Sequence, residues 1–254
     1  MSALRRVLRA PWLWLTLGAL QLALAAGLAA PLRAVLRVSM GPFTIGDERH
    51  VLAALLELVT GHPAVVASFA TTLAASALLG LLLSPLLSGA VITRLAGPAS
   101  VGEQARAAFT HYPAALVIGL YGLLLRLLLA LVAAALGSLH PSLQALALVA
   151  SLTLSALAVD LARARTVLDG ARGLHPRSFL RAIVAASQPT LWLRSGLLTA
   201  LQWTVTLAIL LAAVHGIGSA WSPWLVRGLA LLGTIFALWR VAIAVDVGQA
   251  RPRP

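Results

Sequence analysis

The residues that decide the fold are Pro113–Gly137, PAALVIGLYGLLLRLLLALVAAALG, and Pro141–Ala162, PSLQALALVASLTLSALAVDLA. Only Ser138, Leu139 and His140 separate these two runs. Each run reaches the roughly 20 apolar residues that an α-helix needs to cross the hydrocarbon core of a bilayer. Because the connection is so short, the stretch predicts two antiparallel membrane-spanning helices joined as a hairpin.

The rest of the chain has the same character. Four more windows are long and apolar enough to span: Pro11–Ala30, Ala64–Ile92, Leu191–Val214 and Trp224–Val245. Hydrophobic residues make up 60% of the chain and charged residues 10%, against about 25% charged residues in soluble domains. We therefore predict an all-α polytopic membrane helix bundle of about six transmembrane helices. It forms a single integral membrane domain over residues 1–254, with an extracytoplasmic excursion over residues 31–63 that includes an amphipathic helix at Asp47–Val59.

Arginine counting predicts the orientation. All 19 basic residues are arginines, and cytoplasmic loops carry the excess of positive charge in membrane proteins. Twelve lie on the side of the N-terminus: Arg5, Arg6, Arg9, Arg94, Arg106, Arg163, Arg165, Arg172, Arg177, Arg181, Arg251 and Arg253. Four lie on the other side: Arg33, Arg37, Arg49 and Arg227. Both termini are therefore expected in the cytoplasm. Arginine without lysine indicates GC-rich codons, so we expect the cytoplasmic (inner) membrane of a bacterium.

A hairpin unit is repeated weakly along the chain. Short amphipathic segments precede the odd-numbered spans and are expected as helices in the cytoplasmic interface: Ser2–Pro11, Ser100–Pro113 and Ser178–Pro189. In the third, we expect Arg181 and Ser187 to face water. Four apolar residues are expected to face lipid: Phe179, Leu180, Ile183 and Val184. Ser100 and Glu103 fit a capping box. The even-numbered spans also match, since Ala158–Leu161 (AVDL) and Ala244–Val247 (AVDV) are each followed by Ala-Arg. A weak threefold repeat of interfacial helix, span and span is the predicted arrangement.

The segment Asp160–Arg165, DLARAR, at the cytoplasmic end of a span, and the interfacial segment Ser178–Ser187 carry a resemblance to known proteins. The chain resembles uncharacterised bacterial six-helix integral membrane proteins and is loosely similar to the membrane region of glycerophosphodiester phosphodiesterases. The resemblance covers most of the chain in hydropathy and few residues in identity. Those phosphodiesterases carry their activity on a separate soluble domain, which we do not expect here, so the resemblance implies no activity.

Small residues recur at every fourth position of the second span: Ser68, Thr72, Ser76, Gly80, Ser84 and Ser88. Residues four apart lie on one face of a helix, so they form a small-residue stripe. Small residues allow two helix backbones to approach closely in lipid. The stripe therefore predicts a packing seam. The alternative is a polar face lining a substrate path, with a kink at Pro85.

Three charged residues of the spans are candidate functional residues. Arg126 lies in the middle of its span, where an arginine costs about 2.5–3.5 kcal/mol on insertion scales. It should face the bundle and find hydrogen-bond acceptors. In one interpretation Arg126 is structural and is held by carbonyls, Gln202 or Thr204. In the other it forms an anion-binding or proton-coupled site. Asp160 and Asp246 lie at the inner ends of their spans. Each is expected either to pair with an arginine (Arg163, Arg165, Arg240 or Arg251) or to form an inner gate or a docking point.

No catalytic signature is present. The chain lacks cysteine, and its six histidines have no metal-ligand spacing, so we expect no enzyme activity, cofactor or metal site. Arginines without interleaved aromatic residues favour anionic lipid head groups over nucleic acid. The leading hypothesis is a non-catalytic membrane scaffold or accessory subunit that meets lipids and a membrane or cytoplasmic protein partner. The second is a small transporter or channel that uses a buried Arg126 site.

Overall fold

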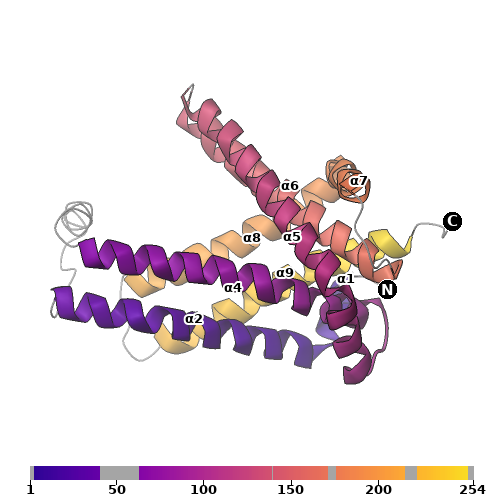
Figure 1. Cartoon of the computed structure of the whole chain (residues 1–254), viewed down its shortest axis with the longest axis horizontal. Coiled ribbons are helices and arrows are strands. Elements are labelled where there is room, and N and C mark those ends of the chain that lie inside the picture. The colour runs from indigo at the N-terminus through magenta and orange to yellow at the C-terminus, as the bar shows by residue number, and fades with distance from the viewer. Residues whose placement is uncertain (1–2, 41–62, 139, 171–175, 215–221, 251–254) are drawn as a thin grey trace. The chain divides into compact units, whose positions relative to one another are not determined.

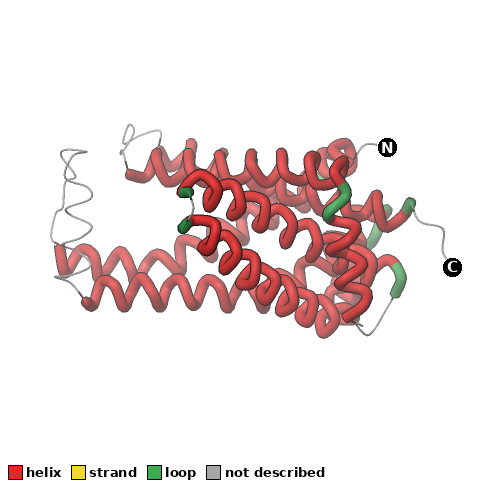
Figure 2. The backbone as a smooth tube through the Cα atoms, turned by 90° about the horizontal axis from the view of Figure 1, so that it is seen from above, coloured by secondary structure: helices red, strands yellow, loops and turns green. Residues whose placement is uncertain are grey.

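The computed structural model describes residues 3–40, 63–138, 140–170, 176–214 and 222–250. Within these ranges all regular structure is helical and there is no strand, as Figure 2 shows, which confirms the all-α prediction. The helices are α1 (Ala3–Leu8), α2 (Pro11–Met40), α4 (Pro63–Ala96), α5 (Val101–Gly137), α6 (Pro141–Leu168), α7 (Pro176–Ala186), α8 (Pro189–Val214) and α9 (Ser222–Gln249) (Figure 1).

Four helices are long and apolar enough to cross a membrane. In the described ranges the qualifying segments are Val66–Ala96, Val101–Gly137, Ser142–Leu168 and Arg227–Gln249. They correspond to the second, third, fourth and sixth predicted spans. The windows of the first and fifth, Pro11–Ala30 and Leu191–Val214, are helical as parts of α2 and α8, but neither is among these four.

The backbone forms two compact units. One contains Met1–Gly18 and Leu81–Pro254, and the other contains Ala19–Gly80. The boundaries fall inside α2 and α4, so each unit holds a part of both helices. In the second unit α2 continues to Met40, so residues 31–40, the beginning of the expected excursion, are helical. The remainder of the expected excursion, residues 41–62 with the predicted helix Asp47–Val59, lies outside the described residues.

Two of the three expected interfacial segments are separate helices. α1 ends at Leu8 before α2 begins at Pro11, and α7 ends at Ala186 before α8 begins at Pro189. Proline suits the first turn of a helix because its missing N–H would have no partner there. The middle segment differs, because α5 runs unbroken from Val101 to Gly137 with Pro113 inside it. A proline removes one backbone hydrogen bond but does not prevent the helix from continuing.

The capping box at the start of α5 is confirmed. The Ser100 hydroxyl accepts a hydrogen bond from the Glu103 backbone N–H at 3.3 Å, and the Ser100 N–H donates to the Glu103 carboxylate at 2.7 Å. Two polar groups at the helix end are thereby satisfied locally.

The core of the larger unit lies around the second half of α6, which contacts α5, α7, α8 and α9. Alanines without exposed surface fill much of this core: Ala158, Ala164, Ala182, Ala186, Ala242 and Ala244. Side chains this small let helices approach closely, as membrane helices do. Two helix backbones approach closely at Gly89 of α4, where a Cβ would lie 2.8 Å from the Cα of Ala108 on α5.

α7 packs differently from the prediction. Phe179 is buried, and its ring lies 5.6 Å from that of Tyr121 on α5. Ile183 is half-buried against the same core, whereas Leu180 and Val184 are exposed apolar residues. The expectation that all four face outward is therefore wrong for Phe179. The helix has two apolar faces, and the neighbouring helices cover only one of them.

Candidate functional site

Arg163 of α6 is the most deeply buried arginine of a polar cluster inside the larger unit. Its side chain is 8% exposed, and Nη1 donates a hydrogen bond to the Ser84 hydroxyl of α4 at 2.6 Å. Nη2 donates to the Ala115 carbonyl of α5 at 3.4 Å. Nε is buried and has no hydrogen-bond partner among the described residues. The expected pairing of Arg163 with Asp160 is not formed, so the hydrogen-bond acceptors of this guanidinium among the described residues are neutral oxygens.

Arg126 of α5 is the second member. Its Nε donates to the Ser155 hydroxyl of α6 at 3.2 Å, and that hydroxyl donates onward to the Leu152 carbonyl at 3.1 Å. Arg126 keeps an exposed surface. The expected acceptor Gln202 binds another arginine, and the hydroxyl of Thr204 donates to a carbonyl of its own helix. The sequence analysis missed Ser155, because serine in an apolar helix gives no sign of its partner.

Asp160 of α6 pairs with Arg240 of α9. Arg240 Nε lies 2.7 Å from Asp160 Oδ2, and the two side chains are 12% and 15% exposed for the aspartate and the arginine. Arg240 Nη1 also donates to the amide oxygen of Gln202 on α8 at 3.4 Å. This pair was one of the alternatives expected from the sequence. These contacts connect α9 with both α6 and α8.

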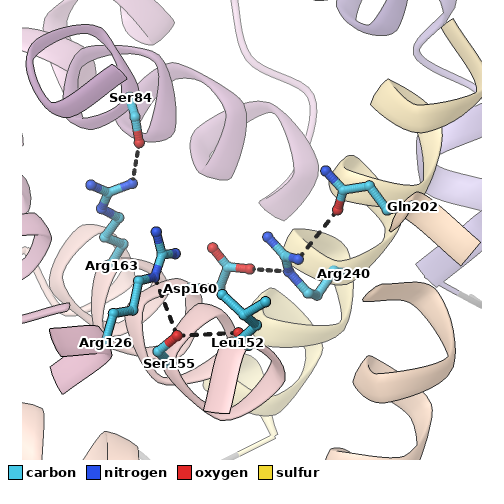
Figure 3. Close-up of polar contacts among 8 residues, drawn as sticks. All are labelled: Ser84, Arg126, Leu152, Ser155, Asp160, Arg163, Gln202 and Arg240. Carbon is cyan, nitrogen blue, oxygen red and sulfur yellow. Dashed lines mark hydrogen bonds and ion pairs between the residues drawn. The ribbon is translucent and has the colours of Figure 1, made fainter. Parts of the chain in front are cut away.

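The cluster converges because helix side chains tilt toward the N-terminus of their own helix. α5 runs opposite to α6 and α9 (Figure 1), so Arg126 reaches in one direction while Arg163 and Arg240 reach in the other. Figure 3 shows Asp160 between Arg126 and Arg240, with Arg163 on the side of Ser84. The charges of Asp160 and Arg240 act on Arg126, and those of Asp160 and Arg126 act on Arg163.

The charge of the cluster is unbalanced. Arg126, Arg163 and Arg240 contribute three positive charges and Asp160 one negative charge, so three minus one leaves two positive charges. Burying an ionised group without an opposite charge is unfavourable in a medium of low dielectric constant. A counter-charge supplied from outside the protein would stabilise this arrangement.

Asp246 pairs elsewhere. It accepts from Arg6 of α1, whose guanidinium also donates to the Ala242 carbonyl at 3.2 Å and to the Gln249 side chain at 3.3 Å. Of the arginines expected as partners of the two aspartates, Arg240 binds Asp160, and Arg251 lies outside the described residues. Asp246 keeps 43% of its side chain exposed. This pair anchors α1 to the end of α9, and Arg6 was not among the partners expected for Asp246.

The small-residue stripe divides into parts with different environments. The hydroxyls of Thr72, Ser76 and Ser88 donate to carbonyls three or four residues earlier in α4. Ser84 instead accepts from Arg163. Gly80 is exposed, and no described atom lies within 4 Å of a Cβ built on it. The backbone contact of α4 occurs at Gly89, one position past the stripe, while Ser68 is half-buried in the smaller unit.

Other candidate chemistry is sparse in the described ranges. Within them there is no group of three or more His, Cys, Asp or Glu side chains that could hold a metal ion. Glu103 caps a helix, and Asp160 and Asp246 each bind an arginine. No protein-family model, curated protein or solved structure matches this chain. The arginine cluster is therefore the strongest basis for a function.

Proposed function

We propose that this chain is an integral membrane protein with six spans and cytoplasmic termini, located in the cytoplasmic membrane of a bacterium. The four long apolar helices and the arginine asymmetry of twelve against four support this topology. In this proposal α2 and α8 supply the remaining two spans. Both begin at a proline that follows a short amphipathic helix, as the repeated unit requires.

Helix contacts support the threefold repeat within this proposal. α7 packs on α6, and α1 packs on α9. The first part of α5 meets α4 at Gly89 and Ala108. In each case the interfacial segment of one repeat lies against the even-numbered span of another repeat. The segment of the first repeat lies on the even-numbered span of the third. The three repeats would thus be linked in a closed cycle.

For its function, we propose a small membrane transporter or channel for anions. The observation that carries this proposal is the excess of two positive charges among Arg126, Arg163, Arg240 and Asp160. Ionisable residues inside membrane proteins are costly and mark substrate pathways or ligand sites. Among the described residues Arg126 and Arg163 donate hydrogen bonds only to neutral oxygens, so both retain the ability to attract an anion. Neither catalysis nor a cofactor is part of the proposal.

A scaffold or accessory subunit of a membrane complex is the second candidate. The ion pair of Arg6 with Asp246 and that of Asp160 with Arg240 favour it, because they join segments that are far apart in the chain. A rigid set of helix ends of this kind suits a docking platform. Exposed Leu180 and Val184 beside the exposed Arg181 would meet the anionic head groups of the cytoplasmic leaflet.

Reconstitution tests the two candidates. Purified protein in liposomes should release trapped anions faster than empty liposomes, with chloride, nitrate, sulfate and phosphate as the panel. Arg163→Gln should lower the flux strongly, whereas Arg194→Gln, on an exposed arginine of α8, serves as the matched control. Flux equal to that of empty liposomes for every anion would reject the transporter. The scaffold would then be tested by cross-linking in native membranes.

A further inference from the structure

We propose that the ligand of the arginine cluster is a compact dianionic oxyanion, a phosphate or sulfate group that binds among Arg126, Arg163 and Arg240. This inference rests on the proposed anion site and adds the charge and shape of its occupant. The juxtaposition of three guanidinium groups with one carboxylate carries it.

Charge is the first argument. The cluster has an excess of two positive charges, and a dianion neutralises both, whereas chloride or nitrate would leave one uncompensated. In a site of low dielectric constant the uncompensated charge is strongly unfavourable. A phosphate group carries between about one and a half and two negative charges at neutral pH.

Free donors are the second argument. Arg163 Nε is buried without a partner among the described residues, although the rest of this side chain is held firmly by Ser84 and Ala115. Within the part of the chain that the structure describes, Arg126 donates only through Nε, so its two terminal nitrogens have no protein acceptor there. Planar guanidinium groups bind oxyanions through paired N–H donors.

Shape is the third argument. The arginines come from three different helices, and Figure 3 draws Arg126 and Arg163 on one side of Asp160 and Arg240 on the other. A tetrahedral oxyanion presents oxygens in several directions and can accept from all of them. An extended dicarboxylate has two separate planar groups, so it fits a single compact site less well. Gly119 leaves space for the Arg163 guanidinium itself, because a Cβ there would lie 3.1 Å from Arg163 Nη2.

The phosphate group has two possible sources, a free anion or a lipid head group. In the proposed topology Arg163 lies near the cytoplasmic end of α6, and Arg126 reaches toward that side. Arg126 also keeps an exposed surface on α5 beside exposed Leu123 and Leu127. Both sources could reach the cluster from the inner half of the membrane, so the experiment includes both.

The test is thermal unfolding of the full chain in detergent, followed by tryptophan fluorescence. Sulfate is the main probe because its charge stays constant near neutral pH, and chloride at equal ionic strength is the comparison. At about one hundred times its Kd, sulfate should raise the Tm by roughly 5–10 °C through preferential binding to the folded state. Chloride should have no saturable effect. Short-chain phosphatidic acid, with phosphatidylcholine as its control, tests the head-group source.

Variants separate binding from general salt effects. Arg163→Gln lowers the excess charge from two to one, so it should abolish the preference for sulfate over nitrate, whereas Arg194→Gln should keep it. Arg126→Gln, at an exposed position, should also abolish the preference for sulfate over nitrate. It replaces Arg163→Gln if that variant fails to fold. A purely structural arginine would change the Tm without changing the preference between anions.

The outcomes are distinguishable. Saturable stabilisation by sulfate, phosphatidic acid or both, lost in the cluster variants, supports the inference and identifies the source. If nitrate or chloride flux depends on Arg163 while sulfate and phosphatidic acid leave the Tm unchanged, the anion function stands and the dianion is wrong. Sulfate stabilisation without flux of any anion would retain the site and reject the transporter. Equal stabilisation in wild type and both cluster variants would overturn the proposed site.

Discussion

Asp160 and Arg240 form an ion pair with a distance of 2.7 Å between Oδ2 and Nε, although they lie on α6 and α9, eighty residues apart. Asp160 is also the single carboxylate among the polar side chains drawn in Figure 3, so it partly neutralises Arg126 and Arg163 as well. The two partners of the pair are therefore not equivalent.

Removing the aspartate charge should be more damaging than removing the arginine charge. Asp160→Asn leaves three guanidinium groups without a carboxylate, and the loss of one partner of a buried pair costs about 3–5 kcal/mol. Arg240→Met leaves Asp160 with Arg126 and Arg163 nearby, so we expect a loss of roughly 1–2 kcal/mol, below that range. Unfolding in detergent measures both. If the two variants lose equal stability, or Arg240→Met loses more, the carboxylate of Asp160 does not stabilise Arg126 and Arg163 as well as Arg240.

Arg126 separates a structural role from a functional one. Arg126→Leu removes the charge together with its desolvation cost, and such replacements are often neutral or stabilising. We expect the Tm to stay the same or rise while anion flux is lost. Arg126→Lys should keep part of the flux, because it retains the charge but loses the planar donor fork. Full flux in Arg126→Leu at an unchanged Tm would remove this residue from the proposed pathway.

Two glycines of α4 should respond in opposite ways to the same substitution. A Cβ at Gly89 would lie 2.8 Å from the Cα of Ala108, so Gly89→Ala must separate the backbones and should destabilise by about 1–3 kcal/mol. Gly80 has open space around it, and alanine favours a helix over glycine by about 1 kcal/mol. Gly80→Ala should therefore be neutral or stabilising. The comparison uses Tm values in one detergent, and a destabilised Gly80→Ala would restore the seam predicted at that position.

Topology can be measured directly because the native chain has no cysteine. Single cysteines at Gly102, at the start of α5, and at Ser138, at its end, should react with a membrane-impermeant reagent from opposite sides. We expect Ser138→Cys to be labelled in intact cells and Gly102→Cys only after lysis, because the arginine-rich ends should face the cytoplasm. Labelling of Gly102→Cys in intact cells would invert the proposed orientation.

Some features could be predicted without coordinates because their causes are local. An apolar environment cannot satisfy backbone N–H and C=O groups, so the long apolar run Pro113–Gly137 predicts a helix. The capping box of Ser100 and Glu103 likewise depends on residues three positions apart. The start of α2 at Pro11 follows from the geometry of proline at a helix start. All these interactions lie within a few residues of chain.

The pairing of charges was decided only by the tertiary structure. Asp160 is three residues from Arg163, yet it binds Arg240, while Arg163 turns to Ser84 on another helix. Asp246 binds Arg6 from the opposite end of the chain. Charged residues on one helix point in different directions around its axis. The helix that packs on each side therefore determines which partner each residue meets. That choice depends on helix packing and crossing, which hydropathy does not encode. For the same reason, the sequence by itself determined long apolar helices in a chain rich in arginine, and packing alone brought three of those arginines near one carboxylate.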